Sequence, residues 1–200
     1  KLVENPSMHA AAKSSLILIL TVFGGHVWAG GSGLNTVVVV NQQSPDSLAL
    51  GNAYCELRGV PPQNVLRVTN WTGGRIEWTR AQYEACLLQP LLAMVAGRGL
   101  TNQAEFVLLS MDIPYRVAEG NAGNSTTSAL FYGFKTNTTS PIPGVPTCSL
   151  PPDSANSYAF SELPFSVAQP LTAPTNSFLT FMLTASNLVE AQTALARGVA

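Results

Sequence analysis

Four polar residues stand directly after predicted buried strands, where the chemistry of an α/β protein is usually found. Asn41 and Ser44 follow one apolar run, and Asp112 and Arg116 follow another. Open α/β sheets bind ligands outside the carboxyl ends of their strands. We therefore expect these residues to converge on one edge of the sheet, near residues 120–124, and to bind a polar ligand. Arg116 would supply a planar donor for a carboxylate or phosphate.

A structural explanation competes with the ligand hypothesis at each position. Ser44 and Asp46 suit the start of a helix, where a Ser side chain caps the free amides and an acid favours the positive end of the dipole. Asp112 and Arg116 can pair with each other or with a loop. The Gly- and Asn-rich residues 120–124 fit either an anion site before a short helix or a plain turn. The sequence leaves these alternatives open.

The position of the histidines limits the catalytic chemistry. The only two, His9 and His26, lie in a segment that we interpret as a signal peptide, so residues 30–200 contain none. A Ser-His-Asp or Cys-His arrangement and a histidine-based zinc site both need imidazole. The three cysteines match no metal-binding spacing: Cys55, Cys86 and Cys148. No phosphate-binding glycine motif follows a predicted strand. We therefore assign no catalytic residue, no metal and no cofactor.

Residues 8–29 have the pattern of a secretory signal peptide. A weakly basic start with Lys13 precedes the apolar run 14–23, and Val27-Trp28-Ala29 offers small or apolar residues at the cleavage positions. The run is about half of the roughly 20 residues that span a bilayer. A buried core helix and an uncleaved anchor are the alternatives. We expect export to the periplasm, the cell surface or the medium, with Lys1 to Ser7 upstream of a start at Met8.

Composition indicates a folded domain with few charges. Hydrophobic residues make up 46% of the chain and charged residues 10%, against about 25% in a typical domain. The formal net charge is -1, and no basic stripe is present. Nucleic acid is therefore not an expected partner. No stable transmembrane anchor is expected in the mature part, and other partners are unknown.

Strands and amphipathic helices alternate along residues 30–200. Strands are predicted at 36–41, 65–69, 106–110 and 177–183. Helices are predicted to begin at Ser44, Thr79 and Asn187, with a shorter one at 127–134 and a kink or break at Pro90. This order predicts a three-layer, doubly wound α/β domain with a mainly parallel sheet. Residues 136–174 are predicted to form a long Pro-rich loop or insertion. The chain stops as its last helix ends, which predicts a further C-terminal part.

Several segments resemble an uncharacterised family of exported bacterial proteins with no assigned activity. The resemblance covers most of residues 36–117 and 177–197, and implies export, an α/β fold and a longer chain. It rests on Val38 to Asn41, Ser44 to Ser47, Arg58 to Pro61, Asn64 to Leu66 and Ile113 to Arg116. At the level of the fold the chain is also similar to caspase-like and gingipain-like cysteine peptidases. In those peptidases a His follows the third strand and a Cys the fourth. Here Met111-Asp112 follows Ser110, and no Cys follows Leu183.

Two functions therefore remain open. One is an exported α/β protein with a hydrolase-like activity. The other is a non-catalytic surface or binding module that uses residues 136–174 as its contact surface.

Overall fold

The main sheet is parallel and has four strands. The computed structural model describes residues 32–119, 122–134, 136–139, 146–149 and 178–198, so the predicted signal peptide and most of the predicted 136–174 loop lie outside it. The strands are β1 (Thr36–Asn41), β2 (Val65–Val68), β4 (Phe106–Leu109) and β9 (Leu179–Met182). Their order is β2-β1-β4-β9, and every neighbouring pair is parallel. The predicted α/β fold is confirmed.

Strand β1 shows why these apolar runs are continuous rather than alternating. All six of its residues are buried. Val37 and Val39 pack in a core on one face of the sheet, and Val38 and Val40 pack in a second core on the other face. Successive side chains of a strand point to opposite faces. Because helices cover both faces, the four valines at the centre of the strand are apolar on both sides.

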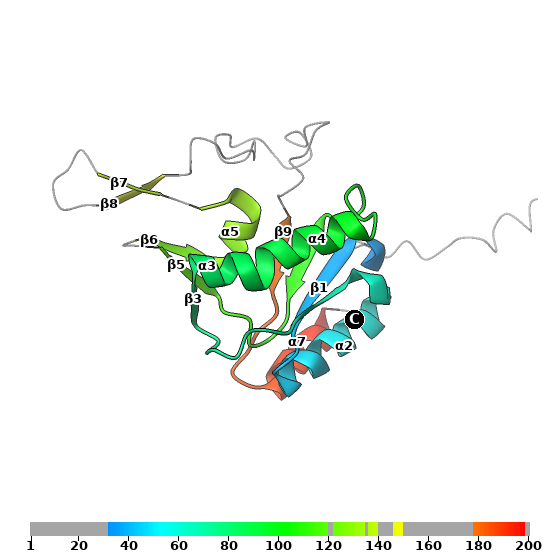
Figure 1. The fold of residues 1–200 in the computed structure, drawn as a ribbon. Helices are drawn as coiled ribbons and strands as arrows, with labels where there is room; N and C mark the ends of the chain where they lie inside the picture. Colours follow the sequence, from blue (N-terminus) through cyan, green and yellow to red (C-terminus); the bar gives the residue numbers. More distant parts are fainter. Residues whose placement is uncertain (1–31, 120–121, 135, 140–145, 150–177, 199–200) are drawn as a thin grey trace, which may run out of the picture. The chain divides into compact units, whose positions relative to one another are not determined.

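Helices lie on both faces of this sheet (Figure 1). Leu50 of α2 (Pro45–Arg58) packs with Ala191 and Leu195 of α7 (Leu188–Arg197) on the Val38 face. The opposite face carries α3 (Arg80–Tyr83), η3 (Glu84–Leu88), α4 (Gln89–Gly97) and α5 (Thr126–Tyr132). Two 3-10 turns, η1 (Gly33–Asn35) and η2 (Pro62–Asn64), precede β1 and β2. These are the three layers of a doubly wound domain.

The predicted helix ends carry the expected caps. The side chain of Ser44 accepts a hydrogen bond from the Ser47 amide at the start of α2. Helix α2 ends at Gly59, whose left-handed φ of 61° suits glycine. Thr79 forms a capping box at α3, and Asn187 caps α7. The predicted starts of these three helices are therefore confirmed.

Pro90 interrupts its helix through a change of hydrogen-bond pattern. A π-helical turn, η3, lies directly before the Gln89–Gly97 segment, and the Gln89 amide donates to the Glu84 carbonyl oxygen. Proline has no amide to donate and crowds the preceding turn. The wider turn accommodates this, and such π-bulges are a recognised cause of irregular helices. Pro90 was predicted to kink or split this helix, but the chain stays helical from Arg80 to Gly97 and changes only its hydrogen-bond pattern.

A second, smaller sheet was not expected from the sequence. It contains β3 (Glu77–Thr79), β5 (Arg116–Glu119) and β6 (Ala122–Ser125), with β3 parallel and β6 antiparallel to β5. Residues 122–124, predicted as part of a turn, thus belong to a strand. Buried Trp78 and Val117 join this sheet to the core on the α4 face. A further antiparallel pair, β7 (Thr136–Thr139) and β8 (Pro146–Ser149), lies within the predicted Pro-rich loop.

Helix α2 approaches β1 closely at Gly51, which gives a test of the packing. A Cβ atom on residue 51 would lie 2.3 Å from Cγ1 of Val40. We expect Gly51→Ala to lower the free energy of unfolding by roughly 1–3 kcal/mol, because overpacking outweighs the better helix propensity of Ala. Gly97 in α4 is the control, since a Cβ atom there would meet no neighbouring atom within 4 Å. Gly97→Ala should stabilise the protein slightly in urea denaturation. Two changes of the same sign and size would contradict this packing.

Candidate functional site

Three of the four predicted site residues come together at the carboxyl ends of β1 and β4. The side-chain amide of Asn41 donates to the Asp112 carbonyl oxygen at 3.1 Å. The Ser44 hydroxyl donates to Oδ2 of Asp112 at 2.6 Å. Residues separated by about seventy positions in the sequence are therefore in direct contact. The predicted convergence is confirmed for Asn41, Ser44 and Asp112.

The strand order explains why this place is open. From β1 the chain crosses to β2 on one side, and the later strand β4 lies on the other side of β1. Connections that leave in opposite directions cross opposite faces of the sheet, so a crevice remains between the two strand ends. Asn41 ends β1, and Asp112 follows shortly after β4. The three residues thus lie at the switch point of the sheet.

Ser44 serves mainly as a helix cap. Its Oγ accepts a hydrogen bond from the Ser47 backbone amide at 3.0 Å, and its hydroxyl donates a hydrogen bond to Oδ2 of Asp112. Only 8% of the residue is exposed. The Ser47 hydroxyl in turn accepts from the Asn41 amide at 2.9 Å, which ties the end of β1 to the first turn of α2. The capping interpretation of Ser44 is therefore confirmed, and its oxygen is already engaged as donor and acceptor.

Asp112 adopts an unusual backbone conformation. Its φ of 57° is the only positive value among the described non-glycine residues. Asp and Asn tolerate this left-handed region better than other residues with a Cβ atom. The turn brings the carboxylate back toward Ser44 and the carbonyl oxygen toward Asn41. Asp112 thus links the turn after β4 to the residues that end β1 and begin α2.

These residues form one wall of a cleft of about 290 Å³. The opposite wall is the loop after β2, where no motif in the sequence indicates a site. The cleft is lined by Asn41, Gln43, Ser44, Trp71, Thr72, Gly73, Arg75 and Asp112. Arg75 and Asp112 are its charged residues. The cleft therefore combines a cation, a carboxylate and several neutral hydrogen-bonding groups.

Packing of Trp71 supports the loop that contains Arg75. Trp71 is 6% exposed, and its indole N–H donates to the Gly74 carbonyl oxygen at 3.2 Å. The Trp71 and Trp78 rings meet edge to face with centroids 5.5 Å apart. A Cβ atom on Gly73 would lie 2.4 Å from the Trp71 ring, so only glycine permits this fold of the loop. Buried aromatic packing thus holds the loop that presents Arg75.

Arg116 is not part of the cleft, which corrects the prediction. It begins β5 in the second sheet, and its Nε lies 2.9 Å from Oε2 of Glu77 on the neighbouring strand β3. The prediction failed because Arg116 belongs to a strand and not to a strand-end loop. Both side chains of this pair are largely exposed, so it is a surface ion pair of small energetic value. Arg75 provides the guanidinium that was expected of Arg116.

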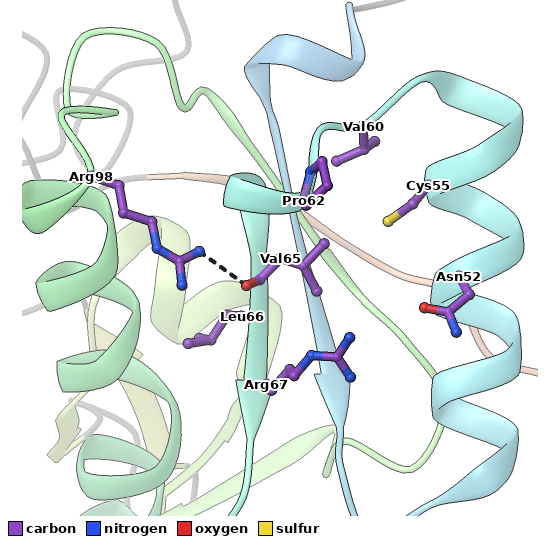
Figure 2. Close-up of a pocket in the computed structure, with 8 residues that line it drawn as sticks. All are labelled: Asn52, Cys55, Val60, Pro62, Val65, Leu66, Arg67 and Arg98. Carbon is purple, nitrogen blue, oxygen red and sulfur yellow. Dashed lines mark hydrogen bonds between the residues drawn. The ribbon is translucent and has the colours of Figure 1, made fainter.

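A second cavity, of about 480 Å³, lies beside the edge strand β2 (Figure 2). Cys55 of α2 faces it, together with Arg67 and Arg98. Burial raises the pKa of the Cys55 thiol, and the nearby Arg67 charge only partly offsets this. Burial also raises the pKa of the Cys86 thiol. The reactive form of cysteine is the thiolate, so neither environment activates a nucleophile.

Comparison with protein-family models, with curated proteins and with solved structures finds no match for this chain. Within the part of the chain that the structure describes, no helix has the length and apolarity to cross a membrane. The case for a function therefore rests on the cleft itself.

Proposed function

We propose that this protein is an exported binding module that takes a small polar ligand with an anionic group into the cleft between Asp112 and Arg75. The observation that carries the proposal is the position of Arg75. It lines the cleft at the switch point of the sheet. Among the described residues, Arg75 forms no ion pair. A guanidinium with free donors suits a carboxylate or phosphate, which it can bind through two parallel hydrogen bonds.

The opposite wall supports a ligand that also carries hydrogen-bond donors. Asp112 accepts one hydrogen bond from Ser44 through Oδ2. An ionised carboxylate has further acceptor sites, so Asp112 can accept from a ligand hydroxyl or amino group. Gln43 and Thr72 add neutral polar groups to the lining. The ligand class is therefore a small hydroxy acid, amino acid or phosphate ester.

The fluorescence of Trp71 tests the proposal, because this indole lines the cleft. The purified chain is titrated with lactate, glycine and glycerol phosphate, with glycerol as the uncharged control. We expect a saturable change for at least one of the anionic or zwitterionic compounds and none for glycerol. Trp71→Phe should remove that signal. An unchanged spectrum with all three compounds would argue against the cleft as a site for this class.

A hydrolase is the second candidate, and the Ser44–Asp112 hydrogen bond is the observation that favours it. A carboxylate can hold a serine hydroxyl in place for attack. However, Ser44 is occupied as a helix cap, and residues 30–200 contain no histidine to take its proton. We therefore expect no labelling by a fluorophosphonate probe. Labelling that is lost in Ser44→Ala would favour the hydrolase instead.

Export is the remaining part of the proposal and rests on the pattern of residues 8–29. We expect cleavage after Ala29, because Val27 and Ala29 are small or apolar residues at the cleavage positions and the apolar run ends shortly before them. N-terminal sequencing of the secreted protein should then begin at Gly30. A mature protein that keeps the apolar run 14–23 would contradict this prediction.

A further inference from the structure

The cavity of about 480 Å³ beside β2 is lined, among the described residues, by positive charge and by no negative charge (Figure 2). Its charged residues are Arg67 of β2 and Arg98, which follows α4. The other lining residues are neutral, and most of them are apolar: Asn52, Cys55, Val60, Pro62, Val65 and Leu66. Sites for small molecules in proteins are typically about 300–1,000 Å³ and mainly apolar. The cavity therefore has the size and lining of a site for a small anion with an apolar body.

Backbone contacts hold the Arg98 side chain at the outer edge of β2. Its Nη1 donates to the carbonyl oxygens of Gln63 and Val65, at 2.5 and 3.2 Å. Its Nε and Nη2 groups have no hydrogen-bond partner in the described part of the chain. A guanidinium carries several N–H donors in a planar fork. Arg98 is therefore positioned by the backbone around β2 and still has donors for a ligand.

The backbone amide of Arg67 lies at the same edge. In a parallel pair, alternate residues direct their main-chain groups toward the same neighbour. The Val68 carbonyl oxygen accepts from the Gln42 amide on the β1 side, so the Arg67 amide points away from β1, and no described residue accepts a hydrogen bond from it. This amide stands beside the Val65 carbonyl oxygen, because in a parallel ladder these two groups would bind the same residue of a further strand. The Arg67 amide and the Arg98 guanidinium are therefore adjacent donors.

We propose that this cavity binds a small carboxylate with an apolar body, such as an aromatic acid. The carboxylate lies at the outer edge of β2, where one oxygen accepts from the Arg67 amide and the other from the free N–H groups of Arg98. A further parallel strand would place a carbonyl oxygen at this position. The apolar body lies against Val60 and Val65, which pack with Cys55 on the α2 side of the sheet.

Two further features of the lining favour an anion. Arg67 forms no ion pair in the described part of the chain, and its Nη1 donates to the neutral Gln42 side chain at 3.1 Å. Burial raises the pKa of the Cys55 thiol, so the thiol is neutral at physiological pH and adds no opposing charge. The cleft differs in this respect, because Asp112 adds a carboxylate to its lining. The cavity thus suits acids without strong hydrogen-bond donors, and this inference does not depend on the proposed function.

Protection of Cys55 from alkylation tests the proposal, because this residue lines the cavity. The full chain is treated with iodoacetamide in mildly alkaline buffer at constant ionic strength, and labelling of each cysteine is followed by peptide mass spectrometry. We expect benzoate to slow the labelling of Cys55 in a saturable way, because the bound acid covers the thiol and its charge disfavours the thiolate. Benzyl alcohol, the uncharged control, should have little effect. Cys86 is buried and does not line the cavity, so its labelling should not respond to benzoate.

Unchanged labelling of Cys55 at high benzoate concentration would overturn the proposal. Equal slowing by benzyl alcohol would overturn it as well, because the charge of the acid would then have no role. Equal slowing of Cys55 and Cys86 would show that benzoate acts on the whole fold and not at this cavity.

Arg98→Ala should raise the benzoate concentration needed for protection roughly 10- to 100-fold, because the variant loses hydrogen bonds to a charged group. Arg197→Ala is the matched control, since Arg197 is an exposed residue of α7 that does not line the cavity. Wild-type protection in Arg98→Ala would refute the site. If that variant fails to fold, the Arg67 backbone amide of the wild type keeps the test decisive. Benzoate should shift its NMR resonance, and an unshifted resonance at saturation would refute the site.

Discussion

Arg75→Ala is expected to weaken the binding of an anionic ligand roughly 10- to 100-fold, because a hydrogen bond to a charged group contributes about 1.5–3 kcal/mol. The melting temperature should hardly change. Arg75 is exposed and has no ion-pair partner among the described residues. Titration with the anionic compound that gives the Trp71 signal measures the affinity, and circular dichroism gives the melting temperature.

Arg116→Ala is the matched control for this experiment. It removes the same type of side chain from a residue that lies nearby in the fold but pairs with Glu77. An exposed ion pair contributes about 0–1 kcal/mol, so stability should change little, and affinity should stay as in the wild type. The opposite pattern, with affinity lost in Arg116→Ala and kept in Arg75→Ala, would restore the interpretation made from the sequence alone.

Asp112→Ala is expected to lower the free energy of unfolding by about 2–3 kcal/mol. The variant loses the hydrogen bond from the Ser44 hydroxyl and places alanine at a φ of 57°. Urea denaturation measures the effect. Asp112→Asn should lose much less, because Asn tolerates the left-handed region and its side-chain oxygen can still accept from Ser44. Equal stability of the Ala variant and the wild type would show that this junction between β1 and β4 is not a stabilising contact.

The main sheet and its helices were predictable because their signals are local. The strand Thr36–Asn41 contains four consecutive valines, a pattern typical of a strand covered on both faces. Ser44, Thr79 and Asn187 are residues that cap helices, and each does so. Given a parallel sheet, the strand-end rule then places Asn41 near Asp112.

The second sheet and Arg75 were not predictable in the same way. Strand β3 has three residues, and β6 reads Ala-Gly-Asn-Ser, a composition typical of turns. These strands form because Trp78 and Val117 pack into a core made by distant residues, which no local pattern reveals. Arg75 follows two glycines in a loop whose course depends on the packing of Trp71. The short distance from Asp112 to Arg116 in the sequence suggested that Arg116 lines the same cleft, whereas the structure places Arg75 there.

The most direct test of the central claim is to locate the bound ligand by NMR. Amide shifts of the full chain are recorded during titration with the compound that changes the Trp71 fluorescence. Binding in the cleft predicts shifts concentrated at residues 41–44, 71–75 and 112, which line it or adjoin its lining residues. Shifts concentrated instead at Cys55, Arg67 and Arg98, around the cavity beside β2, would contradict the claim.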